Sequence, residues 1–217
     1  MRVFIELIPL SFFDRSLQIL IDMPVGADFR ISASGCFMKE LTTKDGLQEC
    51  ASQQAERLLG HPCQNIYQVE IRDEVIDHTN VLVVSYLTLF SMGSDSASVF
   101  KQLRKWEPLQ KRLDLLPGHE KKELEKAKKY LRNKSFTSGI CFEVLPLRFT
   151  LTQMQNLFEE LWERKFDKRN FRKKIARTKY VIPLTEKEYH VSHKPARYYM
   201  FSDELFSFTY KPVMAFP

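Results

Sequence analysis

The feature that most restricts the fold and function of this chain is a basic segment at residues 164–179. It contains nine Lys or Arg residues and a single acidic residue, Asp167. Its local charge of +8 exceeds the net charge of +6 of the whole 217-residue chain, so the remaining residues are slightly acidic in sum. Positive charge that is concentrated in one element is the electrostatic signature of a protein that contacts nucleic-acid phosphates.

The same segment has the pattern of a helix with one buried face. Asp167 is a favourable N-cap residue, and Phe171 and Ile175, four residues apart, form a single apolar stripe. Arg169 and Asn170 lie in the first turn, and these residue types form paired hydrogen bonds with guanine and adenine in the major groove. The pattern therefore predicts a DNA-recognition helix, although an arbitrary basic run is more often a solvated helix face.

The elements on either side of the basic helix favour the DNA-binding interpretation. Residues 150–164 have the clearest helical pattern in the chain, because Thr150 and Gln153 match a capping box and apolar residues repeat along one face. Two strand-like runs, 179–184 and 189–201, follow the basic helix. Helix, turn, basic helix and β-ribbon, in that order, form a winged helix-turn-helix.

This arrangement predicts which residues contact DNA. Residues in the first turn of the basic helix should meet base edges, whereas Lys173 and Arg177, later in the helix, should meet phosphates. His190 and His193 would point to opposite faces of a strand, which suits contacts near phosphate better than a shared metal ion. The predicted DNA-binding residues are Lys168, Arg169, Asn170, Arg172, Lys173, Arg177, His193, Lys194 and Arg197.

The residues before the winged helix have the pattern of a mixed sheet flanked by helices. A charged helix follows at residues 119–134, and a linker at 135–139 comes after it. The narrow apolar stripe of this helix suits packing on a neighbour or bridging two domains. The predicted fold class is thus α+β, with a mixed sheet domain and a winged helix-turn-helix domain. The predicted elements are strands at 3–13, 17–24, 65–72, 81–90 and 140–145 and helices at 47–60 and 119–134.

Cysteine usage and hydropathy indicate the compartment. The four cysteines are widely spaced and contain no C-x-x-C pair, so neither a disulfide framework nor a zinc site is expected. The N-terminal residues do not resemble a signal peptide, and no apolar run approaches the ~18 residues of a membrane span. We therefore expect a cytoplasmic protein without a membrane partner, a metal or a cofactor.

Three segments resemble a known family. Residues 142–161 (FEVLPLRFTLTQMQNLFEEL), 166–175 (FDKRNFRKKI) and 193–201 (HKPARYYMF) closely resemble the carboxy-terminal domain of Nudix-related transcriptional regulators. These are the NrtR type, which controls NAD metabolism, and the arabinose-responsive AraR type. The DKRNFRK run carries most of the resemblance. Residues 17–21, 35–38 and 83–89 fit the strands and the Gly-rich turn of a Nudix-like domain more loosely.

The resemblance implies a domain plan and a set of partners. A Nudix-like effector or sensor domain would occupy residues 1–117, a charged helix and linker 118–139, and the winged helix-turn-helix 140–217. The protein would act as a homodimer on a palindromic operator in double-stranded DNA. A sugar, a sugar phosphate or an ADP-ribose-like compound would be its small-molecule effector.

The chain departs from this family at the residues that carry Nudix chemistry. A Nudix hydrolase uses a helix of pattern R-E-U-x-E-E-x-G, whose glutamates bind the metals that activate water. Aligned on Gly60, the chain has Gln54 in place of one glutamate, and Arg57 and Leu58 in place of the paired glutamates. We therefore predict that the chain is not an enzyme and has no catalytic residues, while an active nucleotide pyrophosphohydrolase with an accessory helical domain is the alternative.

A second departure concerns the effector pocket. Where the family has an aspartate-arginine-rich D-R-D-P turn, residues 72–80 read RDEVIDHTN, and Asp77 alone fits. The effector-binding residues are therefore not predicted. A protein-interaction module that kept the fold and lost both ligands is a third reading, but such a module would not need the basic helix.

Overall fold

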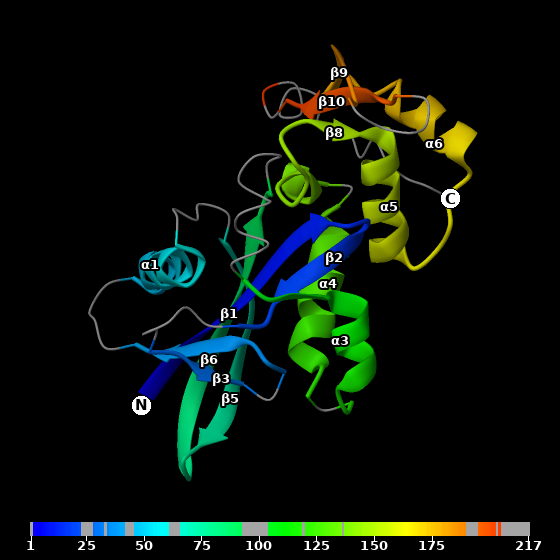
Figure 1. Cartoon of the computed structure of the whole chain (residues 1–217). Coiled ribbons are helices and arrows are strands. Elements are labelled where there is room, and N and C mark those ends of the chain that lie inside the picture. Colours follow the sequence, from blue (N-terminus) through cyan, green and yellow to red (C-terminus); the bar gives the residue numbers. More distant parts are fainter. Residues whose placement is uncertain are drawn as a thin grey trace.

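The computed structural model describes residues 2–22, 28–32, 34–41, 46–60, 66–92, 104–118, 120–135, 137–189, 195–202 and 204. Within these ranges the chain forms a large mixed sheet with helices on both faces and, beyond it, a small helical domain with its own sheet (Figure 1). None of the helices in these ranges is long and apolar enough to cross a membrane. Cys36, Cys50 and Cys141 are buried free thiols, and Cys63 lies outside the described residues.

The first strand is the centre of the large sheet. It pairs in parallel with β6 along one edge, and on its other edge it pairs antiparallel first with β4 and then with β2. Strand β5 extends the sheet beyond β6, and β3 and β7 extend it beyond β4 and β2. The strands are β1 (Arg2–Phe13), β2 (Ser16–Leu20), β3 (Arg30–Ile31), β4 (Phe37–Glu40), β5 (Ile66–Ile76), β6 (Thr79–Phe90) and β7 (Trp106–Pro108).

Two tight turns fix the register of this sheet. Asp14 and Arg15 connect β1 to β2, and Asp77 and His78 connect β5 to β6, and all four residues have positive φ angles between 50° and 65°. Two consecutive residues of positive φ make the turn type whose twist matches that of a β-hairpin. The strands predicted at 3–13 and 17–24 correspond to β1 and β2, although β2 begins at Ser16 and ends at Leu20.

Helices cover both faces of the sheet. Helix α1 (Leu47–Leu59) packs on one face through Ala51, Ala55 and Leu58, and it ends at Gly60, which has φ 75°. Helices α3 (Leu109–Leu115) and α4 (Lys122–Lys134) lie on the opposite face. The helices predicted at 47–60 and 119–134 are thereby confirmed, although the second begins at Lys122.

One hydrophobic core joins this sheet to the C-terminal elements. It contains Ile8 and Leu10 of β1, Leu124 and Leu131 of α4, and residues of all the C-terminal helices. Helix α4 therefore bridges the two parts of the chain, as its apolar stripe predicts. The strand predicted at 140–145 is wrong, because residues 139–142 form a 3₁₀-helix, η1 (Gly139–Phe142). Its three consecutive apolar side chains are all buried, which a strand exposing alternate residues would not achieve.

The C-terminal elements form the predicted winged helix-turn-helix. Helix α5 (Leu151–Trp162) is followed by a turn and by helix α6 (Lys168–Ile175). A three-stranded sheet adjoins them in the order β8–β10–β9, with antiparallel pairing throughout. Residues 190–194, within the second predicted strand-like run, lie outside the described residues. The strands of this sheet are β8 (Phe149–Thr150), β9 (Val181–Lys187) and β10 (Arg197–Phe201).

Candidate nucleic-acid interface

The basic helix α6 is anchored by its two apolar residues. Phe171 and Ile175 are each 1% exposed, and the Phe171 ring lies 6.2 Å from that of Phe158 in α5 and 6.1 Å from that of Phe166. Asp167 caps the helix, because its carboxylate accepts a hydrogen bond of 2.8 Å from the backbone N–H of Asn170. The anchoring residues and the cap are those that the sequence predicts.

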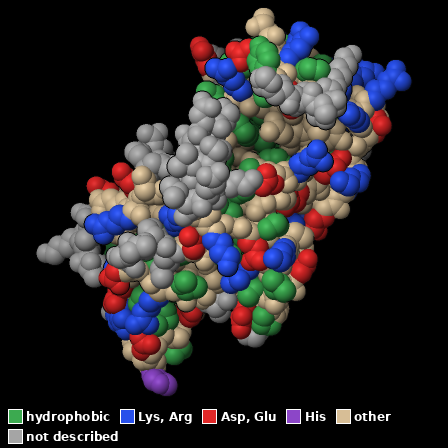
Figure 2. Space-filling model, viewed as in Figure 1, with side chains coloured by type: hydrophobic (Ala, Val, Ile, Leu, Met, Phe, Trp, Pro, Cys, Tyr) green, Lys and Arg blue, Asp and Glu red, His purple; other side chains and the backbone are tan. Residues whose placement is uncertain are grey.

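Anchoring on this side turns a basic stripe outward. With 3.6 residues per turn, Arg169 and Lys173 share the face of α6 opposite Phe171 and Ile175. Both side chains are exposed, and Arg177 follows in the turn that ends the helix. Figure 2 shows Lys and Arg side chains projecting at the end of the molecule where Figure 1 places α6 and the three-stranded sheet. An element with this shape and charge can enter the major groove of DNA.

A groove runs between α6 and the wing strands. It has a volume of about 730 Å³, and its floor is apolar, with Ile175 from α6 and Val181 from β9. Three cationic side chains line it: Arg172 from α6, Lys179 after α6 and Arg197 at the start of β10. The groove can therefore hold one negatively charged backbone against its basic rim.

A second hollow lies on the other flank of α6, against the turn that joins it to α5. Its volume is about 410 Å³. Five cations line it, together with Phe166, Asp167, Asn170 and Phe171. We refer to this hollow as the turn cleft. Its cations are Arg164, Lys165, Lys173, Lys174 and Arg177.

The predicted DNA-binding residues fall into three groups in the structure. Lys168 to Lys173 lie on α6, Arg177 directly after it, and Arg197 on the wing, whereas His193 and Lys194 lie outside the described residues. Lys173 shares the outward face with Arg169, so the helix geometry does not separate a base-reading position from a phosphate position at these two residues. Four further cations of the basic segment line these two hollows but are not among the predicted contacts: Arg164, Lys165, Lys174 and Lys179.

Hydrogen bonds tie α5 of the winged helix to the large sheet. Glu160 of α5 accepts a hydrogen bond of 2.6 Å from the backbone N–H of Leu17, at the start of β2. Burial raises the pKa of Glu160 to about 7, even though the Leu17 N–H and the nearby Lys128 ammonium favour its charged form. Lys128 of α4, itself buried, donates hydrogen bonds to Glu163 after α5 and to Gln110 of α3. The winged helix-turn-helix is thus fixed to the rest of the chain through polar as well as apolar contacts.

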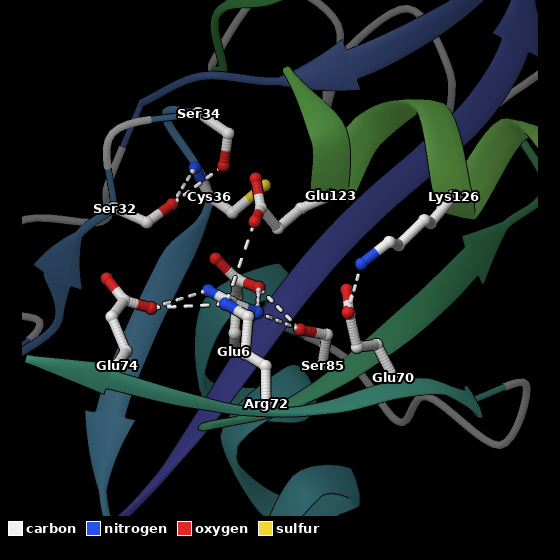
Figure 3. Close-up of polar contacts among 10 residues, drawn as sticks. All are labelled: Glu6, Ser32, Ser34, Cys36, Glu70, Arg72, Glu74, Ser85, Glu123 and Lys126. Carbon is white, nitrogen blue, oxygen red and sulfur yellow. Dashed lines mark hydrogen bonds and ion pairs between the residues drawn. The ribbon is translucent and has the colours of Figure 1, made fainter. Parts of the chain in front are cut away.

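A buried polar network holds α4 on the large sheet (Figure 3). Glu6 of β1 is fully buried, and one of its oxygens accepts hydrogen bonds of 2.9 Å from Arg72 and 2.6 Å from the Ser85 hydroxyl. Burial opposes the charge on Arg72, but the hydrogen bond and attraction to Glu6 and its neighbours outweigh it and raise the pKa of Arg72. Glu123 of α4 lies 3.6 Å from Arg72, and Lys126 of α4 pairs with Glu70. The position of α4 on the large sheet is therefore fixed by ion pairs as well as by apolar packing.

The departures from the Nudix pattern lie where α1 faces strand β4. Gln54 and Arg57 line a hollow of about 230 Å³, together with Lys39 and Glu40 of β4. Glu40 is engaged elsewhere, because both of its oxygens accept hydrogen bonds of 2.7 Å from Arg2. Asp77, the residue that fits the family's aspartate-arginine turn, lies at the tip of the β5–β6 hairpin and pairs with Arg30 at 2.8 Å.

Comparisons with known proteins agree with this architecture. Residues 141–201 match the family model of the NrtR DNA-binding winged helix domain. The search of curated proteins found no match. The chain is similar in structure to NrtR of Shewanella oneidensis, both in a crystal structure without the DNA and in one of its complex with a 27mer DNA. Both comparisons give a TM-score of 0.72 at 16% identity, and they cover 94–95% of this chain and 95–97% of the other.

A Nudix protein has a similar fold as well. The match to a MutT/nudix family protein from Enterococcus faecalis has a TM-score of 0.62 at 16% identity, with 92% of this chain and 87% of that chain covered. The predicted α+β fold, a Nudix-like part followed by a winged helix, is therefore confirmed. Residues 141–201 therefore match the NrtR DNA-binding winged helix domain, and the chain as a whole has a fold similar to that of Shewanella oneidensis NrtR.

Proposed function

We propose that this protein is a transcriptional regulator that binds double-stranded DNA through α6 and carries a catalytically inactive Nudix-like sensor domain. The observation that carries the proposal is the outward basic stripe of α6, held in place by Phe171 and Ile175 within a winged helix of the NrtR DNA-binding type. The DNA complex of the structurally similar Shewanella oneidensis protein supports it. The sensor would occupy residues 1–117 and the winged helix 140–217.

The proposed orientation predicts a base-specific role for Arg169. We expect Arg169→Ala to cost about 1–3 kcal/mol of binding free energy on a site selected from random duplexes and much less on a scrambled duplex. Lys122→Ala, on the exposed side of α4, is the matched control and should change neither affinity. Affinities for both duplexes can be compared by fluorescence anisotropy at fixed salt. Equal losses on the two duplexes would mean that Arg169 contributes only charge.

The side chains on α1 support an inactive sensor. Gln54 has no carboxylate with which to bind a metal ion, and the cation of Arg57, one turn further along, would repel one. An effector bound at this hollow would meet Lys39 and Arg57, which suits a sugar phosphate or an ADP-ribose-like compound better than a neutral sugar. Incubation of the wild type with nucleoside diphosphate derivatives and Mg²⁺ should release no product. Turnover by the wild type that Arg57→Glu alters would contradict the assignment, because it would come from this hollow.

A homodimer is part of the proposed function, because one short recognition helix reads only a half-site. We expect sedimentation at micromolar concentration to give a dimer and the selected DNA sites to be palindromes. The spacing of the two half-sites should be a whole number of helical turns, because both recognition helices must enter the same face of the duplex. Single copies of a half-site among the selected sequences, together with a monomer in solution and on DNA, would exclude the dimer.

A further inference from the structure

A buried carboxylate contacts the turn that borders the turn cleft. Glu159 of α5 is 9% exposed, and its two oxygens accept hydrogen bonds from the Phe166 backbone N–H at 3.0 Å, from Gln155 at 2.9 Å and from the Lys165 ammonium at 2.8 Å. Burial raises the pKa of Glu159, but these hydrogen bonds outweigh it, so the pKa lies below its usual value. Glu159 therefore stays charged and holds the backbone of the turn in one conformation.

The turn so fixed presents cations toward those of α6. The Arg164 guanidinium lies over the Phe166 ring, 4.8 Å from its centre, and Lys173 and Lys174 face the same hollow from the helix. Among the described residues that line the cleft, Asp167 is the one acid, and its carboxylate accepts the hydrogen bond that caps α6. Glu159 pairs with one of the five cations, Lys165. The cleft thus has a large excess of positive charge, and its ligand must be an anion.

The position of the cleft indicates which anion. The outward stripe of α6, with Arg169 and Lys173, is flanked on one side by the groove beside the wing and on the other by the turn cleft. The major groove of B-DNA is about 12 Å wide and is bounded by one phosphate backbone on each side. A helix that enters the groove with this stripe foremost brings its two flanks to the two backbones.

We propose that the turn cleft is a second phosphate-binding surface, which holds the backbone strand opposite to the strand held at the wing. Arg164 and Lys174 bind phosphates of that strand, whereas Lys179 and Arg197 bind phosphates of the other strand. This proposal rests on the proposed function, because it assigns the two strands of the DNA that α6 enters. It makes the turn between α5 and α6 a part of the DNA interface.

The test removes charge from each flank separately. The cleft variant combines Arg164→Gln with Lys174→Gln. The wing variant combines Lys179→Gln with Arg197→Gln. The control variant combines Lys111→Gln on α3 with Lys122→Gln on α4. Each removes two positive charges from exposed or partly exposed positions. We expect the cleft and wing variants each to reduce the slope of log affinity against log salt by roughly 2 on a random-sequence duplex, and the control to leave it unchanged. Thermal melting of each variant verifies that it is folded.

Ethylation interference on a site selected from random duplexes then assigns the strands. For the wild type we expect interfering phosphates on both strands of a half-site. The cleft variant should lose interference on one strand, and the wing variant on the other. Loss on the same strand in both variants, or full interference retained in the cleft variant, would overturn the proposal. Displacement of the duplex by poly-glutamate at equal charge concentration would also overturn it, since the cleft would then be a general anion site.

The same experiments separate this proposal from the proposed function. If the wild type binds no duplex, the DNA-binding function itself is wrong and the cleft proposal fails with it. If the wild type binds DNA and only the wing variant changes the salt dependence, the DNA-binding function stands and the assignment of the cleft alone is wrong.

Discussion

Replacing Phe171 by Ala is expected to lower the free energy of unfolding by about 3–5 kcal/mol, the usual cost of removing a large aromatic side chain from a core. The ring is 1% exposed and packs against the rings of Phe158 and Phe166, so the substitution removes apolar burial and two aromatic contacts and leaves a cavity. DNA binding should be lost as a consequence, because α6 has no other large apolar anchor besides Ile175 among its described residues. Denaturant unfolding of the full chain measures the change.

Two further variants make this prediction sharper. Leu147→Ala removes an apolar side chain that is 73% exposed, and it should change the free energy of unfolding by no more than about 0.5 kcal/mol. Phe171→Leu keeps most of the apolar volume and should cost clearly less than Phe171→Ala. If Phe171→Ala melts like the wild type, the face that α6 turns toward the core is misassigned, and so is its outward stripe.

The second large effect is a dependence of stability on pH that comes from Glu160. Burial raises the pKa of this carboxyl to about 7 from the ordinary 4.5. Because the folded state holds the proton more tightly, the stabilisation is complete below pH 4.5 and is lost as the pH rises through about 7. A shift of this size corresponds to at most about 3 kcal/mol. The wild type should therefore lose stability relative to a neutral variant between pH 5 and pH 8.

Glu160→Gln isolates this contribution. The glutamine carbonyl can still accept the Leu17 N–H, and no negative charge has to be buried above pH 7. We expect the free-energy difference between the variant and the wild type to grow in favour of the variant from pH 5 to pH 8. Glu56→Gln, at an exposed position on α1, is the matched control for the loss of one carboxylate. Parallel stability curves for wild type and Glu160→Gln would show that Glu160 is well solvated.

The winged helix could be predicted from local sequence because its signals are local. Thr150 and Gln153 form the capping box that their spacing predicts, with hydrogen bonds of 3.2 Å and 2.7 Å, and Asp167 caps α6 three residues before Asn170. Caps and apolar stripes depend on neighbours within about one helical turn, which a sequence displays directly.

Other parts of the chain depend on distant residues and could not be predicted in this way. Helix α3 and strand β7 have no sequence signal of their own. Within the part of the chain that the structure describes, β7 pairs with β2 alone, which lies more than eighty positions away. The run at 140–142 is apolar enough for a strand, but its packing into the shared core selects a 3₁₀-helix. Lys128 is the clearest case at a single residue, since a lysine in a charged helix is expected in solvent and here is 7% exposed.

In the candidate site, too, local features could be predicted from the sequence and features that depend on distant residues could not. The sequence indicates which helix carries the basic residues, and the structure confirms which of its residues are buried. The division of the cations between two flanks could not be predicted, because it depends on how the α5–α6 turn and the wing fold back beside α6. Arg164 and Lys179 are both in the basic segment, yet the first lines the turn cleft and the second the groove beside the wing.

In the proposed function, the outward stripe of α6 reads DNA sequence. The most direct measurement is selection of binding sites from a random duplex library, carried out in parallel with the wild-type full chain and with Arg169→Ala. We expect the wild type to enrich one palindromic sequence. We expect Arg169→Ala to remain folded and still to bind duplex through its remaining positive charge, but to enrich sequences that are relaxed at the position Arg169 contacts. If the wild type enriches no sequence, or if Arg169→Ala enriches the same sequence to the same extent, α6 does not read DNA in the way that its structure indicates.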